Sequence, residues 1–257
     1  MDDYLNSITD RKIYMQLKKE DIQLLEHVLS KEVEELKRLR KLKEENKLDF
    51  GKTPSWEEAY NLLGQVKNEV ESFLGITRLQ EPIICYPYTT NQYCDKAKIV
   101  YLENEERTLL IPALGHEYTH HIQTMIYPKI MREYDYRYMA FCEGHARSMQ
   151  RYIAERYRQK EDNEAFLYDI TEMTTGEMKS LYKRVCLKKW AMPNKGLIKI
   201  KTRMDRLEIA SKILDFGRPS EYAAGNTYFL VQETKNGKGV HKDMIKKLQE
   251  AQEAKNI

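Results

Sequence analysis

Several features are missing from this chain, and each absence narrows the classes of protein to which it can belong. No apolar run approaches the roughly 18–20 residues of a membrane-spanning helix, so we expect no membrane partner. The segment that begins at Met1 lacks a basic stretch followed by an apolar one, and no signal peptide is predicted. The four cysteines form no C-x-x-C pair, which favours free thiols in a reducing compartment. Together these absences predict a cytoplasmic protein.

The chain does contain enough apolar surface for a substantial core. Its 257 residues are 41% hydrophobic and include 18 tyrosines, which argues against disorder. The net charge of +3 gives no global attraction to nucleic acid or membranes. Residues 183–218 form a basic block with 11 lysines and arginines. A solvated face is the favoured interpretation of this block, ahead of an acidic substrate or partner. A nucleic-acid anchor is a third alternative, but we do not expect nucleic acid as a partner, and the oligomeric state is not predicted.

The N-terminal region, residues 1–52, is highly charged and is predicted to be helical over residues 11–48. Its apolar positions recur at nearly heptad spacing, but Glu32 interrupts them. This pattern favours a helical hairpin packed on the body of the protein over an extended coiled coil.

A second helix is predicted to begin at Ser55, which forms a capping box with Glu58. It should run to about Phe73 and end at Gly75, a residue type that favours helix termination.

Short strands are predicted next, at residues 82–86 and 98–102, with a third candidate at residues 108–111. A central helix should then start near Pro112 and stop at Pro128, and the remaining chain is helical almost to its end. This order predicts an α+β fold that is mostly helical, with a small mixed sheet before the central helix and a helical C-terminal lobe.

The central helix carries an H-E-x-x-H motif, His116-Glu117-Tyr118-Thr119-His120. On a helix its two histidines stand one turn apart and can bind one metal ion, while Glu117 can accept a proton from a water on that metal. Leu114, Tyr118 and Ile122 lie on the opposite side of the helix. We therefore expect an amphipathic helix whose back lies in a core and whose histidines face outward; histidines satisfied within a packed core would lie on the apolar side instead.

A catalytic zinc usually takes three protein ligands and keeps a fourth position open for water. The favoured third ligand is Glu143, because the 23 residues after His120 allow a second helix to return alongside the first. Gly144 has no bulk, so this helix is expected to approach the motif helix closely. The alternative is a surface glutamate paired with Arg147 one turn further on.

Two other histidines are weaker ligand candidates. His121 turns back towards the apolar side and should be packed or hydrogen-bonded, and His145 should point away from Glu143. The elongated metzincin motif is excluded, because Gln123 and Ile126 stand where it requires a glycine and a histidine.

The combination of His116-Glu117-x-x-His120 with Glu143-Gly144-x-Ala146 resembles the gluzincin metallopeptidases, especially their small peptidase-MA-like relatives. The resemblance continues in Tyr222-x-x-Gly225 and covers roughly residues 82–158 and 220–237. It implies zinc as the cofactor, with metal ligands His116, His120 and Glu143. It also implies that Glu117 is the catalytic base and that the Tyr222 hydroxyl assists the oxyanion.

By this resemblance, residues 53–257 should form a zincin-like catalytic domain. Its upper lobe would be residues 53–127, with the sheet and motif helix, and its helical lower lobe residues 128–257. The expected function is a zinc metallopeptidase acting on peptides or proteins. Exopeptidase activity is not expected, since the G-x-M-E-N segment of the gluzincin aminopeptidases is absent. A substrate strand could pair with a sheet edge near residues 98–102.

Two features leave alternatives open. The chain could be a latent protease or a non-catalytic regulatory or binding protein of the same fold, with residues 1–52 or the basic block covering the cleft or recruiting a partner. A two-histidine, one-glutamate ligand set also accepts divalent metals other than zinc.

Overall fold

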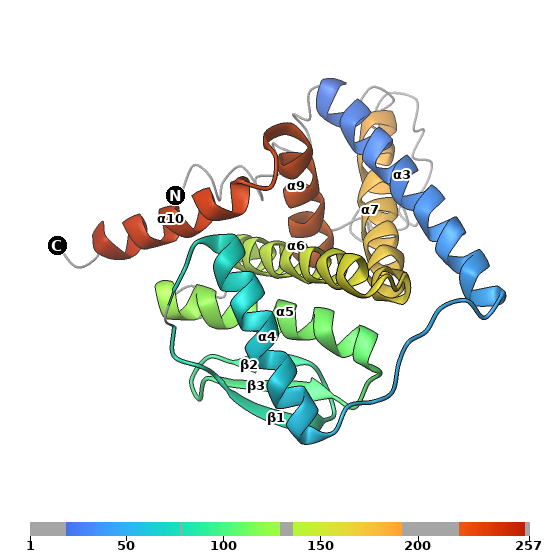
Figure 1. Cartoon of the computed structure of the whole chain (residues 1–257). Helices are drawn as coiled ribbons and strands as arrows, with labels where there is room; N and C mark the ends of the chain where they lie inside the picture. Colours follow the sequence, from blue (N-terminus) through green and yellow to red (C-terminus); the bar gives the residue numbers. More distant parts are fainter. Residues whose placement is uncertain (1–18, 78, 129–135, 192–220, 255–257) are drawn as a thin grey trace, which may run out of the picture.

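The computed structural model describes residues 19–77, 79–128, 136–191 and 221–254. Within these ranges two helices come first in the chain, three short strands follow, and the later elements are all helices (Figure 1). They are α3 (Lys19–Glu44), α4 (Trp56–Leu74), β1 (Ile83–Tyr88), β2 (Gln92–Cys94), β3 (Ile99–Glu103), α5 (Arg107–Ile126), α6 (Tyr136–Glu161), α7 (Ala165–Ala191), α9 (Glu221–Asn236) and α10 (Val240–Ala254). The predicted mostly helical α+β fold is confirmed.

The three-stranded sheet has the order β1-β3-β2, with β1 parallel and β2 antiparallel to β3. Ile99 of β3 lies opposite Ile83 on one side and Cys94 on the other. The middle strand therefore has no free edge, and the expected substrate edge near residues 98–102 is wrong.

The third predicted strand is also wrong. Residues 108–111 belong to α5, which begins at Arg107, and the third strand is Gln92–Cys94 instead. A short apolar run fits a buried strand and a buried helical turn equally well, and here the run is the buried start of a helix. For the same reason Pro112 lies inside α5 and not at its beginning.

The ends of α4 follow its sequence signals. The Ser55 hydroxyl accepts from the Glu58 backbone N–H, and the Glu58 carboxylate accepts from the Ser55 backbone N–H, which is the predicted capping box. Gly75 ends the helix in the left-handed region at φ 73°. These caps fix where α4 begins and ends, and its buried face packs on α5.

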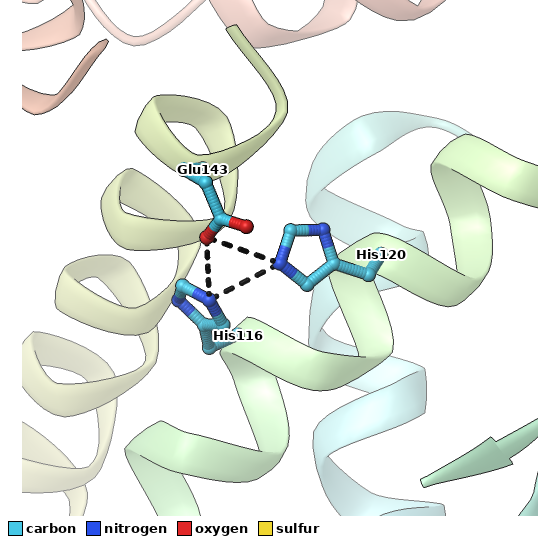
Figure 2. A group of neighbouring side chains, drawn as sticks. All are labelled: His116, His120 and Glu143. Atoms are coloured by element: carbon cyan, nitrogen blue, oxygen red, sulfur yellow. Dashed lines mark hydrogen bonds and ion pairs between the residues drawn. The ribbon is translucent and has the colours of Figure 1, made fainter. Parts of the chain in front are cut away.

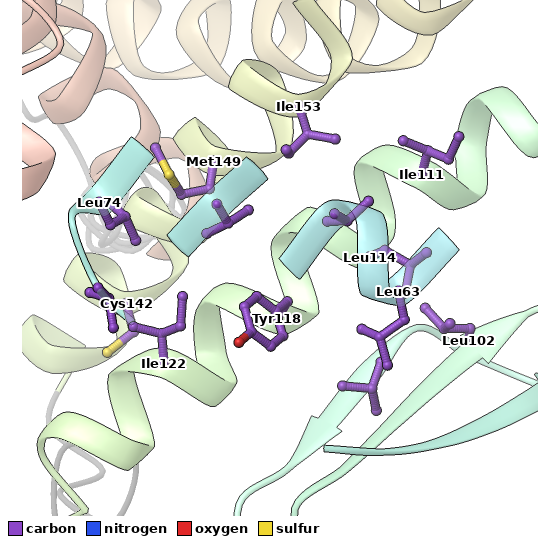
Figure 3. Packing of buried hydrophobic residues seen from close by; sticks show 14 of the residues in the cluster. Leu63, Leu74, Leu102, Ile111, Leu114, Tyr118, Ile122, Cys142, Met149 and Ile153 are labelled. Atoms are coloured by element: carbon purple, nitrogen blue, oxygen red, sulfur yellow. The ribbon is translucent and has the colours of Figure 1, made fainter. Parts of the chain in front are cut away.

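Helix α5 lies at the centre of the molecule, between α4 and the sheet on one side and α6 on the other (Figure 1). Leu63 of α4, Leu102 of β3 and Met149 of α6 belong to the main core together with Leu114 and Tyr118 of α5 (Figure 3). A second, smaller cluster lies where α3 meets α7 and α9, and it comprises Leu25, Val28, Met178 and Leu230.

The described part of the charged N-terminal region is the helix α3, which packs along α7 and contacts α9. Packing on the body is what the sequence predicts, but residues 19–44 form one continuous helix, and no hairpin turn is found within them. Residues 1–18 lie outside the described residues, and the division at residue 52 stays a prediction. Most of the basic block, residues 192–218, also lies outside them. In the described ranges no helix is long and apolar enough to cross a membrane.

The thiols agree with the cysteine pattern as far as the side chains are described. Cys85, Cys94 and Cys142 are free. Burial raises the pKa of the Cys142 thiol, so this thiol stays protonated and inert.

Candidate metal centre

Three predicted ligands lie together between α5 and α6. His116 and His120 project from successive turns of α5 towards Glu143 on α6 (Figure 2). The two Nε2 atoms are 3.2 Å apart, and Glu143 Oε2 lies 3.3 Å from His116 Nε2 and 3.4 Å from His120 Nε2. The donor atoms form a nearly equilateral triangle, and this group could hold a metal ion.

The histidines do not face outward as the sequence analysis expects. His116 is 7% exposed and His120 is 4% exposed. Helix α6 covers the face opposite Leu114 and Tyr118, so α5 is enclosed on both sides. The polar face of α5 is directed into an internal polar site and not into solvent.

The surface-glutamate alternative for Glu143 is also wrong. Glu143 is 6% exposed, and Arg147 pairs with Glu177 of α7 at 3.5 Å instead. Buried carboxylates are rare unless a cation compensates their charge.

The electrostatics of the triad follow from a carboxylate enclosed beside two imidazoles. Burial works to raise the pKa of Glu143, but the charge of His120 and hydrogen bonds from both rings outweigh it and hold the pKa below its usual value. Burial lowers the pKa of His116 to about 4. For His120, burial is opposed and outweighed by the Glu143 charge, which raises the pKa to about 9. The carboxylate therefore stays ionised and requires a positive charge beside it.

A cleft of about 220 Å³ opens beside the triad. His116, Glu117, Arg147 and Tyr222 line one part of it. The rest of the lining is mixed: apolar side chains from the first half of α5 and from α7 lie beside polar ones, among them Asn91, Glu105, Gln150 and Asp169. Burial raises the pKa of Glu117 to about 7. The carboxyl group beside the triad is therefore close to the balance between its two protonation states at neutral pH.

Tyr222 reaches this cleft from α9. It is the second residue of the helix, and its ring stacks on His116 with centroids 6.4 Å apart and an interplanar angle of 24°. The Arg147 guanidinium lies 5.0 Å from the centre of the same ring. Partial burial and the nearby Glu143 raise the pKa of Tyr222, so the phenol keeps its proton.

A close crossing of α6 and α9 positions Glu143 and Tyr222. A Cβ added to Gly144 would lie 2.3 Å from the Gly225 carbonyl carbon, and one on Gly225 would lie 1.8 Å from the Ala140 carbonyl oxygen. Gly144 therefore makes room for α9, and not for the motif helix as the sequence analysis expects. The close approach to α6 on the α5 side occurs at Gly115, where an added Cβ would lie 2.9 Å from Ile153.

The two other histidine candidates stay outside the triad. His121 is fully buried and bonds to the Tyr93 hydroxyl at 3.1 Å and the Gln80 carbonyl oxygen at 2.7 Å, in agreement with its predicted structural role. His145 is equally buried, and its Nδ1 lies 3.2 Å from Gln123 Nε2.

Sequence reasoning missed one residue of the site. Gln123 enters the sequence analysis only as a departure from the metzincin motif, yet its Oε1 lies 3.0 Å from His120 Nδ1. Its spacing of three residues from His120 was the available signal, because residues three apart share a helix face.

Comparisons with known proteins identified no relative: no family model, no curated protein and no solved structure matches the chain. The resemblance to gluzincins therefore stays a prediction from the motifs.

Proposed function

We propose that this chain is a zinc-dependent peptidase that cleaves bonds within peptides or proteins. The observation that carries the proposal is the triangle of donor atoms with edges of 3.2, 3.3 and 3.4 Å. Tetrahedral zinc with bonds of about 2.0–2.1 Å separates its ligand atoms by about 3.3–3.4 Å. The donor set of His116, His120 and Glu143 therefore fits zinc in chemistry and in spacing.

When bound there, zinc would lower the pKa of a water molecule and polarise a scissile carbonyl. Glu117 is the residue of this chain suited to move the proton. Its carboxyl group lines the same cleft, and its pKa of about 7 lets it accept a proton and pass it on near neutral pH. We assign it the role of general base and then of general acid towards the leaving amine.

Tyr222 is the proposed hydrogen-bond donor to the oxyanion. Its phenol stays protonated because its pKa is raised, and it lines the cleft beside His116. The guanidinium of Arg147 lies against the ring and restricts its rotation. A donor already held in position needs no reorganisation when negative charge develops on the substrate.

The length of the cleft supports a peptide as substrate. Its wall follows α5 from Thr108 to His116, a rise of about 12 Å for eight helical residues. An extended peptide covers that distance with about three or four residues. The apolar residues of its lining, such as Leu109 and Phe166, can pack against the side chains of that peptide. With no G-x-M-E-N segment to bind a free amino terminus, we propose cleavage inside the chain.

The decisive experiment compares cleavage of casein and of a peptide library by the wild-type protein and by Glu117→Gln, with zinc content measured in each. The variant should retain zinc and lose at least about 100-fold in rate, the usual contribution of a general base. Glu71→Gln is a matched control: Glu71 is also a buried glutamate, but it accepts from Tyr118 away from the cleft. Equal rates for wild type and Glu117→Gln would exclude the mechanism.

The alternative function is a latent protease or a non-catalytic binding protein. In the described part of the chain, α3 contributes no side chain to the cleft and instead packs on α7. We therefore expect truncation before Thr53 to lower stability without releasing activity. A wild-type protein that binds zinc, and that stays inert before and after this truncation, would support the binding role.

A further inference from the structure

The amide of Gln123 connects the candidate metal centre to a second group of buried polar residues. Its Nε2 lies 3.1 Å from the Cys142 carbonyl oxygen and 3.2 Å from His145 Nδ1, and its Oε1 lies 3.0 Å from His120 Nδ1. Gln123, His120 and His145 are all buried. Enclosed amides and imidazoles of this kind have their orientation set by their neighbours.

The neighbours determine the direction of each hydrogen bond. A carbonyl oxygen can only accept, so the group facing Cys142 must be the amide NH₂ of Gln123. Its oxygen therefore faces His120, and His120 Nδ1–H donates to it. The Nε2 of His120 is then left as the nitrogen that faces His116 and Glu143, where a metal ligand is required.

The same reasoning continues on the other side of Gln123. His145 Nδ1 accepts from the amide NH₂, so the proton of the neutral ring is on Nε2. His241, in the first turn of α10, donates from Nε2 to Glu233 Oε1 at 2.8 Å.

His145 and His241 contact each other through their rings and not through a hydrogen bond between the remaining ring nitrogens. His145 Nε2 and His241 Nδ1 are both buried and have no hydrogen-bond partner in the described part of the chain. The rings of His145 and His241 stack, with centroids 5.2 Å apart. Phe229 packs against both rings, at 5.5 and 5.3 Å, and holds them together.

We propose that Gln123, held by the Cys142 carbonyl oxygen and by His145, positions His120 for metal binding, and that His241 supports His145 by ring stacking. Through this stacking, metal affinity depends on the docking of the first turn of α10 against α6 and α9. Gln123 is the main positioning residue, since it alone touches a ligand, and His145 and His241 act through it. The inference rests on the proposed metal site, whose ligands it leaves unchanged.

The test measures zinc affinity of the full-length protein by competition with a chromophoric chelator, and coordination geometry by the absorption spectrum of bound Co²⁺. Gln123→Met keeps the side-chain length but removes the acceptor, and it should weaken zinc binding by about 10–100-fold and alter the Co²⁺ spectrum. His121→Phe is the matched control, since His121 is equally buried beside His120 but bonds to Tyr93 and Gln80. Its zinc affinity should stay within about twofold of wild type.

A conservative variant separates positioning from packing. Gln123→Glu keeps an acceptor oxygen for His120 but leaves the Cys142 carbonyl without its donor. It should lower thermal stability and still bind zinc within a few-fold of wild type. His145→Phe and His241→Phe should reduce zinc affinity less than Gln123→Met, with His241→Phe giving the smaller effect.

The outcomes distinguish this inference from the proposed function. Wild-type zinc affinity in a folded Gln123→Met, or in both His145→Phe and His241→Phe, would overturn the positioning role alone. Equal losses in Gln123→Met and His121→Phe would do the same. A wild-type protein that binds zinc but cleaves no peptide would overturn the peptidase proposal and leave the positioning test intact. A wild-type protein that binds no zinc would overturn both.

Discussion

Two groups of helices in this protein are held together in different ways. In the central group, α6 and α9 meet backbone to backbone at Gly144 and Gly225, and α5 meets the Ile153 side chain of α6 at Gly115. The candidate ligands project beside these contacts. In the outer pair, α3 packs on α7 through a small apolar cluster, and Arg40–Glu172 is an exposed ion pair across it. The difference indicates that close backbone contact occurs where the candidate ligand atoms must be positioned to tenths of an ångström. The outer pair has only to stay packed, and side-chain contacts are enough for that.

The largest difference between the groups should appear when a glycine on each side is replaced by alanine. In Gly225→Ala the new methyl would overlap the Ala140 carbonyl oxygen, so the crossing of α6 and α9 must open. We expect a loss of about 3 kcal/mol or more in the free energy of unfolding. In Gly176→Ala on α7 the added atom meets nothing within 4 Å, and stability should rise by about 0.5–1 kcal/mol. Urea denaturation of both variants measures the two changes in the free energy of unfolding. Similar changes in Gly225→Ala and Gly176→Ala would show that the crossing of α6 and α9 is not tight.

Removal of the metal should affect the central group specifically. Zinc at about 100 times its dissociation constant stabilises a folded protein by about 2.7 kcal/mol. Because His120 and Glu143 come from different helices, chelation should release the tie between α5 and α6. Thermal melts with zinc and with chelator give the difference. Glu143→Gln should lose most of this zinc-dependent stabilisation, whereas a variant of the outer pair such as Glu172→Gln should retain all of it.

The elements that could be predicted from sequence are those encoded by neighbouring residues. The capping box at Ser55 and the stop at Gly75 are local, and both are observed. The one-turn spacing of His116 and His120, together with an acidic residue on a returning helix, is enough to predict the group of three side chains that the structure brings together.

What covers a helix face is not a local property, and the sequence predictions fail there. The polar face of α5 was predicted to meet solvent, but α6 encloses it. Gly144 was recognised as a site of close approach, but its partner, Gly225, is 81 residues away and on another helix. The role of Gln123 depends on Cys142 and His145, and no spacing rule connects those three residues.

The next prediction concerns the contact between the outer pair and the central group of helices. Glu32 of α3 pairs with Arg151 of α6, and the side chains are 17% and 13% exposed. Because the pair is shielded from water, its loss in Glu32→Gln should cost about 1–2 kcal/mol of unfolding free energy. A double-mutant cycle with Arg151→Gln isolates the coupling of the two charges. A coupling energy near zero would mean that the ion pair does not stabilise the contact between α3 and α6.

The smallest effect is expected at the exposed pair of the outer helices. Arg40 and Glu172 lie 2.6 Å apart, but their side chains are 53% and 44% exposed, so water and salt screen their attraction. Glu172→Gln should shift the melting temperature by no more than about 2 °C, and the shift should vanish in high salt. Melts of Glu172→Gln and Glu32→Gln at low and high salt make the comparison directly. If removal of the exposed pair lowered stability as much as removal of the shielded pair, the packing of α3 on α7 would depend on charge. It would then not depend on the second, smaller apolar cluster, which includes Leu25 and Met178.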